Sequence, residues 1–207
     1  MRSAILESRA QPIINLARSH PSTSYDGWFV PLTAGGGNAT ASLLTGTPYG
    51  VAARRVNTAA GTPGAAGVGL IIADGNLTAL VRPAIRYAMS YWCRSSVAQS
   101  LRCRAQYLNA AASAGWTFDA PDVTLIPNQW ARLSIITTSP AEAAQLRMDL
   151  LFGNAAVAFG VNDTFDIAGA MVTEGSNLYP FSDGAMPKWR YLNGNSGPSI
   201  GYPPPPA

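Results

Sequence analysis

Charged residues are scarce in this chain, and several reactive side chains are rarer still. Asp, Glu, Lys and Arg make up 12% of the 207 residues, against about 25% in ordinary globular domains. Lys188 is the single lysine, His20 is the single histidine, and Cys93 and Cys103 are the only cysteines. So little charge favours a surface that lies against other subunits over one that faces dilute solution.

Dense basic clusters and long apolar runs are missing as well. The net charge is +3, but the arginines are scattered, and the densest basic spots are Arg54 with Arg55 and Arg102 with Arg104. Nucleic-acid-binding arms carry longer basic runs, so we expect no nucleic-acid partner. No stretch approaches about 18 consecutive apolar residues and no leader pattern is present, so we expect no membrane insertion.

Short strand patterns make up most of what the sequence contains. Apolar or alternating segments are separated by turns rich in Gly, Pro, Asn and Asp, and no long amphipathic helix pattern interrupts them. The segments are 12–16, 39–44, 49–56, 68–73, 84–94, 101–108, 122–126, 130–138, 145–152 and 163–173. This profile predicts an all-β, antiparallel β-sandwich of the jelly-roll type.

Two of these segments alternate most clearly between apolar and polar residues. They are 84–94 and 101–108, and the short connection between them predicts a β-hairpin. In that hairpin Trp92, Arg102 and Arg104 lie together on the face directed away from the core.

The last strand pattern leads into a distinctive C-terminal motif. The apolar run ends at Glu174 and Gly175, and is followed by LYP at 178–180, DG at 183–184, WRYLNG at 189–194 and SGPS at 196–199. Over residues 163–202 this pattern resembles the end of minor tail proteins from tailed phages of actinobacteria. In that family the segment closes a jelly-roll domain similar to carbohydrate-binding modules.

The resemblance implies a virion component assembled in the host cytoplasm and displayed on the tail or another exposed surface. The strand pattern divides the chain into an N-terminal segment (1–12), a jelly-roll domain (13–175) and a C-terminal extension (176–207). The N-terminal segment is either an arm that docks on a neighbouring subunit or a frayed terminus. The implied partners are other virion structural proteins, further copies of the chain and a host cell-wall glycan. A capsid decoration protein of the same fold and a free glycan-binding module remain the alternatives.

Exposed aromatic rings beside polar groups are what a sugar-binding site requires. Trp92 with Arg102 and Arg104, and Trp116 in a loop or short strand, are the predicted glycan-binding residues. Trp92 has a second interpretation, in which the second sheet or a neighbouring subunit covers it.

The extension carries aromatic residues that need a partner surface. They predict assembly contacts through Tyr179, Phe181, Trp189 and Tyr191.

No pattern of catalytic residues stands out. His20 has no G-x-S-x-G nucleophile elbow to serve, and the carboxylate pairs Asp119/Asp122, Asp163/Asp166 and Glu174/Asp183 lie beside turns, where Asp is common. We expect no enzyme activity and no cofactor. Carbohydrate-binding jelly rolls often hold a structural calcium, bound in part by the acidic residue that ends an entry motif before the first strands. Asn15-Leu16 and Pro21-Ser22 resemble that motif, but Thr23-Ser24-Tyr25 stand where it has the acidic residue, so we expect no metal.

The cysteines leave two alternatives open. In the predicted hairpin Cys93 and Cys103 lie opposite one another with Cβ atoms roughly 4.5–5.5 Å apart, slightly long for a disulfide. Assembly in a bacterial cytoplasm favours two reduced, buried thiols.

Overall fold

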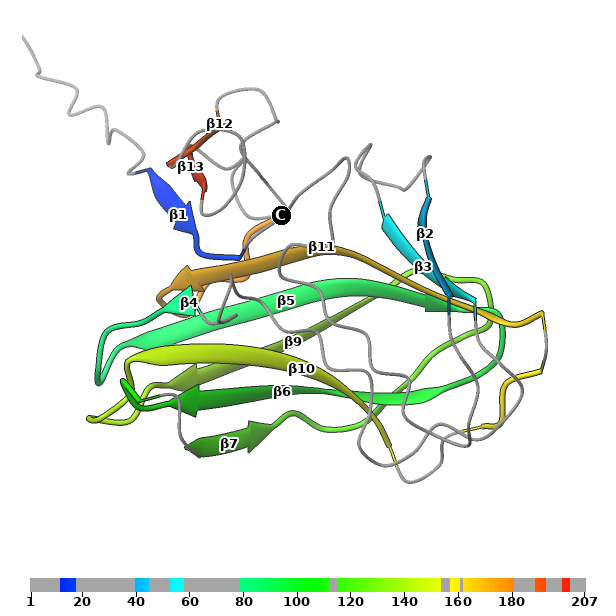
Figure 1. The fold of residues 1–207 in the computed structure, drawn as a ribbon, viewed down its shortest axis with the longest axis horizontal. Helices are drawn as coiled ribbons and strands as arrows, with labels where there is room; N and C mark the ends of the chain where they lie inside the picture. The colour runs from blue at the N-terminus through cyan, green and yellow to red at the C-terminus, as the bar shows by residue number, and fades with distance from the viewer. Residues whose placement is uncertain are drawn as a thin grey trace, which may run out of the picture.

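Two antiparallel sheets form a β-sandwich in the computed structural model (Figure 1). The structure describes residues 12–17, 40–44, 53–57, 79–111, 115–153, 157–160, 162–180, 189–192 and 199–201. Within these ranges every regular element is a strand, which confirms the predicted fold class. The strands are β1 (Ile13–Asn15), β2 (Thr40–Leu44), β3 (Ala53–Asn57), β4 (Ala79–Leu80), β5 (Arg86–Ser95), β6 (Ser100–Leu108), β7 (Trp116–Asp119), β8 (Val123–Thr124), β9 (Ala131–Thr138), β10 (Gln145–Phe152), β11 (Thr164–Glu174), β12 (Trp189–Tyr191) and β13 (Ser199–Gly201).

One sheet, called here the β11 sheet, has the strand order β2-β3-β11-β5-β9. The other, called the β6 sheet, has the order β4-β10-β6-β7, with β8 also paired to β6. Alternate residues of the long strands point between the sheets and form one apolar core, with Tyr91, Tyr107 and Phe165 among its fully buried side chains. The hydroxyls of Tyr107 and Thr137, 2.7 Å apart, join β6 to β9 across this core.

The predicted hairpin between residues 84–94 and 101–108 is wrong. β5 pairs with β11 and β9, whereas β6 pairs with β10, β7 and β8, so the two strands lie in facing sheets. Alternation of apolar and polar residues identifies which face of each strand is buried. The same alternation is expected whether the two strands pair in a hairpin or lie in facing sheets joined by an arch, a connection that crosses the sandwich. Residues 96–99 connect the two sheets. Four residues are enough, because an extended segment of that length spans roughly 13 Å and packed sheets lie about 10 Å apart.

Polar side chains hold this arch in place. Gln99 is fully buried, and its amide both donates to the carbonyl of Val157 at 2.7 Å and accepts from its N–H at 3.0 Å. Ser96 donates from Oγ to Asp163 at 2.7 Å and accepts from the N–H of Thr164 at 2.9 Å. The polar side chains of the crossing segment therefore bond to protein groups, whereas those of a hairpin turn would bond to water.

The arch also decides how the cysteines lie. Cys93 and Cys103 are fully buried free thiols in the core, one contributed by each sheet. Burial raises the pKa of both thiols, that of Cys103 to about 12. Because the thiolate is the reactive form, the folded protein keeps both sulfurs unreactive at neutral pH.

β11 contains a β-bulge between Ala168 and Met171, where Gly169 adopts a φ of 61°. The fully buried Asn15 fills it: its Nδ2 donates to the carbonyl of Ala170 at 3.2 Å, and its Oδ1 accepts from the N–H of Val172 at 2.9 Å. This fixes β1 against β11. A small sheet of order β1-β13-β12 is thereby placed on the side of the β11 sheet that faces away from the β6 sheet (Figure 1).

Candidate functional site

The outer face of the β11 sheet carries a row of charged side chains from three neighbouring strands. Asp166 of β11 pairs across the sheet with Arg55 of β3 on one side and with Arg94 of β5 on the other. Nε and Nη2 of Arg55 donate to the two carboxylate oxygens at 2.8 and 3.0 Å. Nε and Nη2 of Arg94 both donate to Oδ2, at 2.9 and 2.6 Å. One carboxylate therefore orders two guanidiniums.

Burial within this row is uneven. The side chain of Asp166 is 1% exposed, whereas those of Arg55 and Arg94 are 31% and 26% exposed. The carboxylate forms the floor of the row and the guanidiniums reach the surface. The hydrogen bond from Arg55 to Asp166 raises the pKa of that guanidinium, which keeps it charged.

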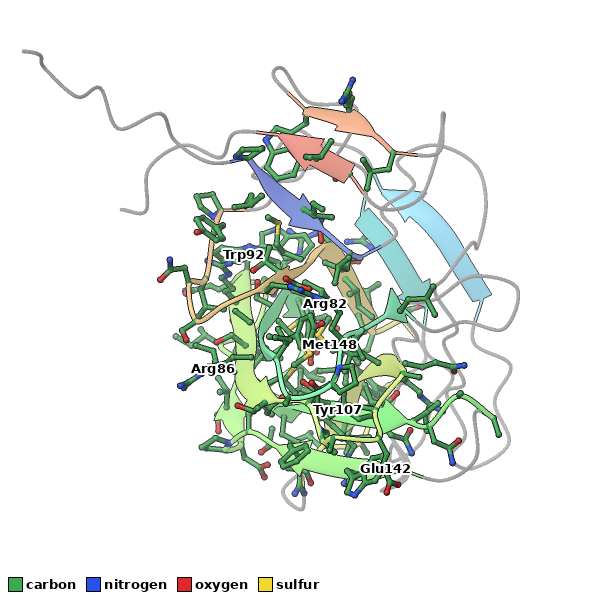
Figure 2. All side chains as sticks on the ribbon, turned by 90° about the vertical axis from the view of Figure 1, so that its left-hand side faces the viewer. Arg82, Arg86, Trp92, Tyr107, Glu142 and Met148 are labelled. Atoms are coloured by element: carbon green, nitrogen blue, oxygen red, sulfur yellow. The ribbon has the colours of Figure 1, made fainter. Side chains whose placement is uncertain are left out.

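Two tryptophans flank Arg94 on this face. Trp130 directly precedes β9, and the guanidinium carbon of Arg94 lies 4.9 Å from the centre of its ring, a cation–π contact. Trp92 lies two residues before Arg94 on β5, with Ala168 of β11 and Arg132 of β9 as its cross-strand neighbours. Both tryptophans are half-buried residues. In Figure 2, Trp92 lies on the side of the sandwich that carries β1, away from Tyr107 and Met148 in the core.

Arg132 closes this group. Its Nη2 donates to Oγ of Ser90 at 2.8 Å and to the carbonyl oxygen of Tyr179. The contact ties the segment after β11 to the outer surface of the same sheet. We call this surface the tryptophan–arginine face and define it by six residues, Arg55, Trp92, Arg94, Trp130, Arg132 and Asp166.

The predicted glycan-binding residues are divided among three places. Trp92 lies on the tryptophan–arginine face, whereas Arg102 and Arg104 lie together on the outer face of the β6 sheet. Trp116 belongs to β7, where it pairs with Tyr107 and packs against the core. Placing Trp92 beside the two arginines depended on the hairpin, so that grouping is wrong for the reason given above.

Carboxylates neutralise Arg102 and Arg104 where they lie. Arg104 donates from Nε and Nη2 to the two oxygens of Asp119 at 2.6 and 2.8 Å. Arg102 lies 3.1 Å from Asp122 and 3.6 Å from Asp119. The hydrogen bond from Arg104 lowers the pKa of Asp119, so these groups stabilise one another at neutral pH.

Of the six residues of this face only Trp92 was predicted; Arg55, Arg94, Trp130, Arg132 and Asp166 were missed as site residues. Alternation along β5 already places Arg94 on the face of Trp92, and that was the available signal. The partners of Asp166 lie 72 and 111 residues away in sequence, and no local pattern indicates them.

The predicted assembly residues are partly engaged within the chain. Trp189 is 8% exposed in β12, and Tyr179 is half-buried, with its carbonyl bound to Arg132. Phe181 and the side chain of Tyr191 lie outside the described residues, as do His20 and Asp183.

The described residues bring no metal-binding group together. No cluster of three or more His, Cys, Asp or Glu side chains occurs among them.

Asp149 of β10 is 5% exposed, and desolvation raises its pKa although Arg147 donates to it at 2.6 Å. Within the described ranges no helix is long and apolar enough to cross a membrane.

Comparison with known proteins identifies solved structures of the same fold. No protein-family model and no curated protein matches the sequence. The CBM22-2 xylan-binding domain of Paenibacillus barcinonensis Xyn10C is similar with a TM-score of 0.55 and 13% identity, covering 77% of this chain and 99% of that domain. A xylan-binding domain of CBM 22 gives 0.52 and 14%, covering 83% of this chain and 99% of that one.

A third similar structure contains the CBM22-1 and GH10 modules of Clostridium thermocellum xylanase 10B, complexed with xylohexaose. Its TM-score is 0.55 at 11% identity, and the match covers 84% of this chain but 31% of the xylanase chain. Identities this low show the fold and nothing finer. The chain has the jelly-roll β-sandwich architecture seen in carbohydrate-binding modules.

Proposed function

We propose that this protein is a non-catalytic glycan-binding module and that the tryptophan–arginine face is its binding surface. The observation that carries the proposal is the presence of two half-buried tryptophans, Trp92 and Trp130, on one sheet face beside fixed polar groups. Indole rings stack on the apolar faces of sugars, and guanidinium groups donate hydrogen bonds to hydroxyls. The similarity to xylan-binding domains supports a polysaccharide over a small metabolite as the ligand class.

The rigidity of this face also supports the proposal. Trp92, Arg94 and Arg132 project from two paired strands in the middle and at the edge of a sheet. Groups on strands are held more precisely than groups on loops. Little conformational entropy is then lost when a ligand settles on them.

Affinity electrophoresis through gels containing xylan or isolated cell-wall polysaccharide tests the proposal. We expect retardation of the wild type and its loss in Trp92→Ala and in Trp130→Ala, because stacking on one ring is worth about 1 kcal/mol or more. Phe118→Ala is the matched control, since it removes a 38% exposed ring from the other sheet. Equal retardation of all four proteins would place the binding surface elsewhere, and none for a folded wild type would reject the function.

We further propose that the module serves a tailed-phage virion, as a minor tail protein that attaches the particle to the host surface. The motif of residues 163–202 and the charged content of 12% carry this proposal. Immunogold electron microscopy of released particles tests it. Label on the tail supports it, label on the capsid favours the decoration protein, and label on neither favours a free glycan-binding module.

A further inference from the structure

The tryptophan–arginine face holds more positive charge than its carboxylate can neutralise. Arg55 and Arg94 share Asp166, and among the described residues neither forms an ion pair with any other acid. The three groups therefore carry a net formal charge of +1. On the outer face of the β6 sheet the balance differs: Arg102, Arg104 and Arg147 are matched by Asp119, Asp122 and Asp149.

Arg55 and Arg94 keep N–H donors that Asp166 does not use. Each guanidinium spends Nε and Nη2 on Asp166, and within the described part of the chain neither uses Nη1. Both side chains are partly exposed, at 31% and 26%. Because Asp166 already fixes their orientation, they present ordered donors to a ligand with little further loss of side-chain entropy.

The aromatic rings lie where a sugar would bring an acidic group to these donors. Trp130 contacts Arg94 directly, with the guanidinium carbon 4.9 Å from the ring centre. Trp92 lies two residues before Arg94 on β5, so their Cα atoms are about 7 Å apart. A sugar ring stacked on either indole therefore places an attached carboxylate within reach of the Arg94 guanidinium.

We infer that this face selects glycans bearing uronic acids, whose carboxylates bind the free edges of Arg55 and Arg94 while neighbouring sugar rings stack on Trp92 and Trp130. Asp166 shows how a carboxylate is held by these two residues, through paired N–H donors at 2.6–3.0 Å. The inference rests on the proposed glycan-binding function and adds the chemical class of the ligand.

Two forms of one polysaccharide test the inference. Glucuronoxylan and the same polymer with its carboxyl groups reduced to alcohols differ in charge but not in backbone. We expect the intact, wild-type protein to bind the acidic form about tenfold or more tightly, as one charge-assisted contact allows. The preference should shrink as NaCl rises above about 0.1 M, where the Debye length falls below about 10 Å.

Two variants assign the preference to residues. Arg55→Gln and Arg94→Gln each remove one guanidinium and should lower binding to glucuronoxylan about tenfold. Arg147→Gln is the matched control, because Arg147 is 34% exposed and pairs with a 6% exposed carboxylate on the other sheet. Thermal unfolding of each variant confirms that it is folded before binding is measured.

The outcomes separate this inference from the proposed function. Equal affinity for the acidic and reduced polymers leaves a glycan-binding module but overturns the selection of uronic acids. A loss in Arg147→Gln as large as in the other variants also overturns it, since the effect would then be general charge. Absence of binding to both polymers overturns the inference, and it rejects the proposed function as well when the folded wild type also fails to bind isolated cell-wall polysaccharide.

Discussion

Replacing Asp166 by asparagine is the sharpest test of how the tryptophan–arginine face is built. The change keeps the side-chain shape but leaves two guanidiniums facing an amide that offers a single acceptor oxygen. Removing one partner of a fully buried ion pair costs about 3–5 kcal/mol. Arg55 and Arg94 are 31% and 26% exposed, so water solvates them again when the carboxylate is gone. We therefore expect a smaller loss, about 2–3 kcal/mol of the free energy of unfolding.

Urea unfolding followed by tryptophan fluorescence measures this loss. For a domain of this size a loss of 2–3 kcal/mol corresponds to a fall in melting temperature of roughly 4–12 °C. Asp119→Asn is the control, because Asp119 is 31% exposed in its pair with Arg104 and surface pairs contribute about 1 kcal/mol or less.

The comparison between the two variants decides the question. If Asp166→Asn destabilises the protein no more than Asp119→Asn, Asp166 does not act as a buried anchor, and the argument that it orders the arginines fails. Combining Asp166→Asn with Arg94→Gln adds a second check. The double variant should lose about 1 kcal/mol less free energy of unfolding than the sum of the two single variants, because either single change already breaks the ion pair between Asp166 and Arg94.

Three further predictions concern the rest of the sandwich. Cys93 and Cys103 should resist iodoacetamide in the folded protein at pH 8 and react on unfolding, as counted by mass spectrometry; labelling without unfolding contradicts their burial. Gly115→Ala should destabilise by about 1–3 kcal/mol in urea unfolding, because a Cβ there would lie 1.6 Å from a backbone oxygen of β6; an unchanged midpoint contradicts that packing. The lowered pKa of Asp119 means that its contribution is complete above the unfolded value of 3.8 and is lost as pH falls through the folded pKa. Stability of Asp119→Asn should therefore fall less steeply than that of the wild type below about pH 4, and identical slopes refute the pairing.

Local chemistry was enough to predict most strands and their ends. The end of β11 follows from the charge of Glu174 and from Gly175, which adopts a φ of 101° that other residues rarely accept. The buried faces of β5 and β6 follow from strict alternation of their apolar residues. These features depend on neighbouring residues only, so a single sequence contains them.

Strand partners were harder to predict because they depend on contacts between distant segments. Ser95 to Ser100 looks like a turn, and nothing in that stretch shows that Gln99 bonds to Val157, 58 residues further along. Because of this error Trp92 was expected on the same sheet as Arg102 and Arg104, whereas it lies on the outer face of the opposite sheet. A site assembled from several strands inherits every error in the pairing of those strands.

The same dependence explains why the sequence suggests Asp166 as half of a carboxylate pair with Asp163 and gives no sign of its arginine partners. In the fold the two are separated by role: Asp163 accepts from Ser96 and the N–H of Gly160, whereas Asp166 lies buried beneath two arginines. A buried carboxylate needs compensating charge, and one guanidinium would suffice for neutrality. The second guanidinium exceeds what the fold requires and lies beside a half-buried tryptophan. That surplus, and not the number of arginines in the chain, is what directs an anionic ligand to this face.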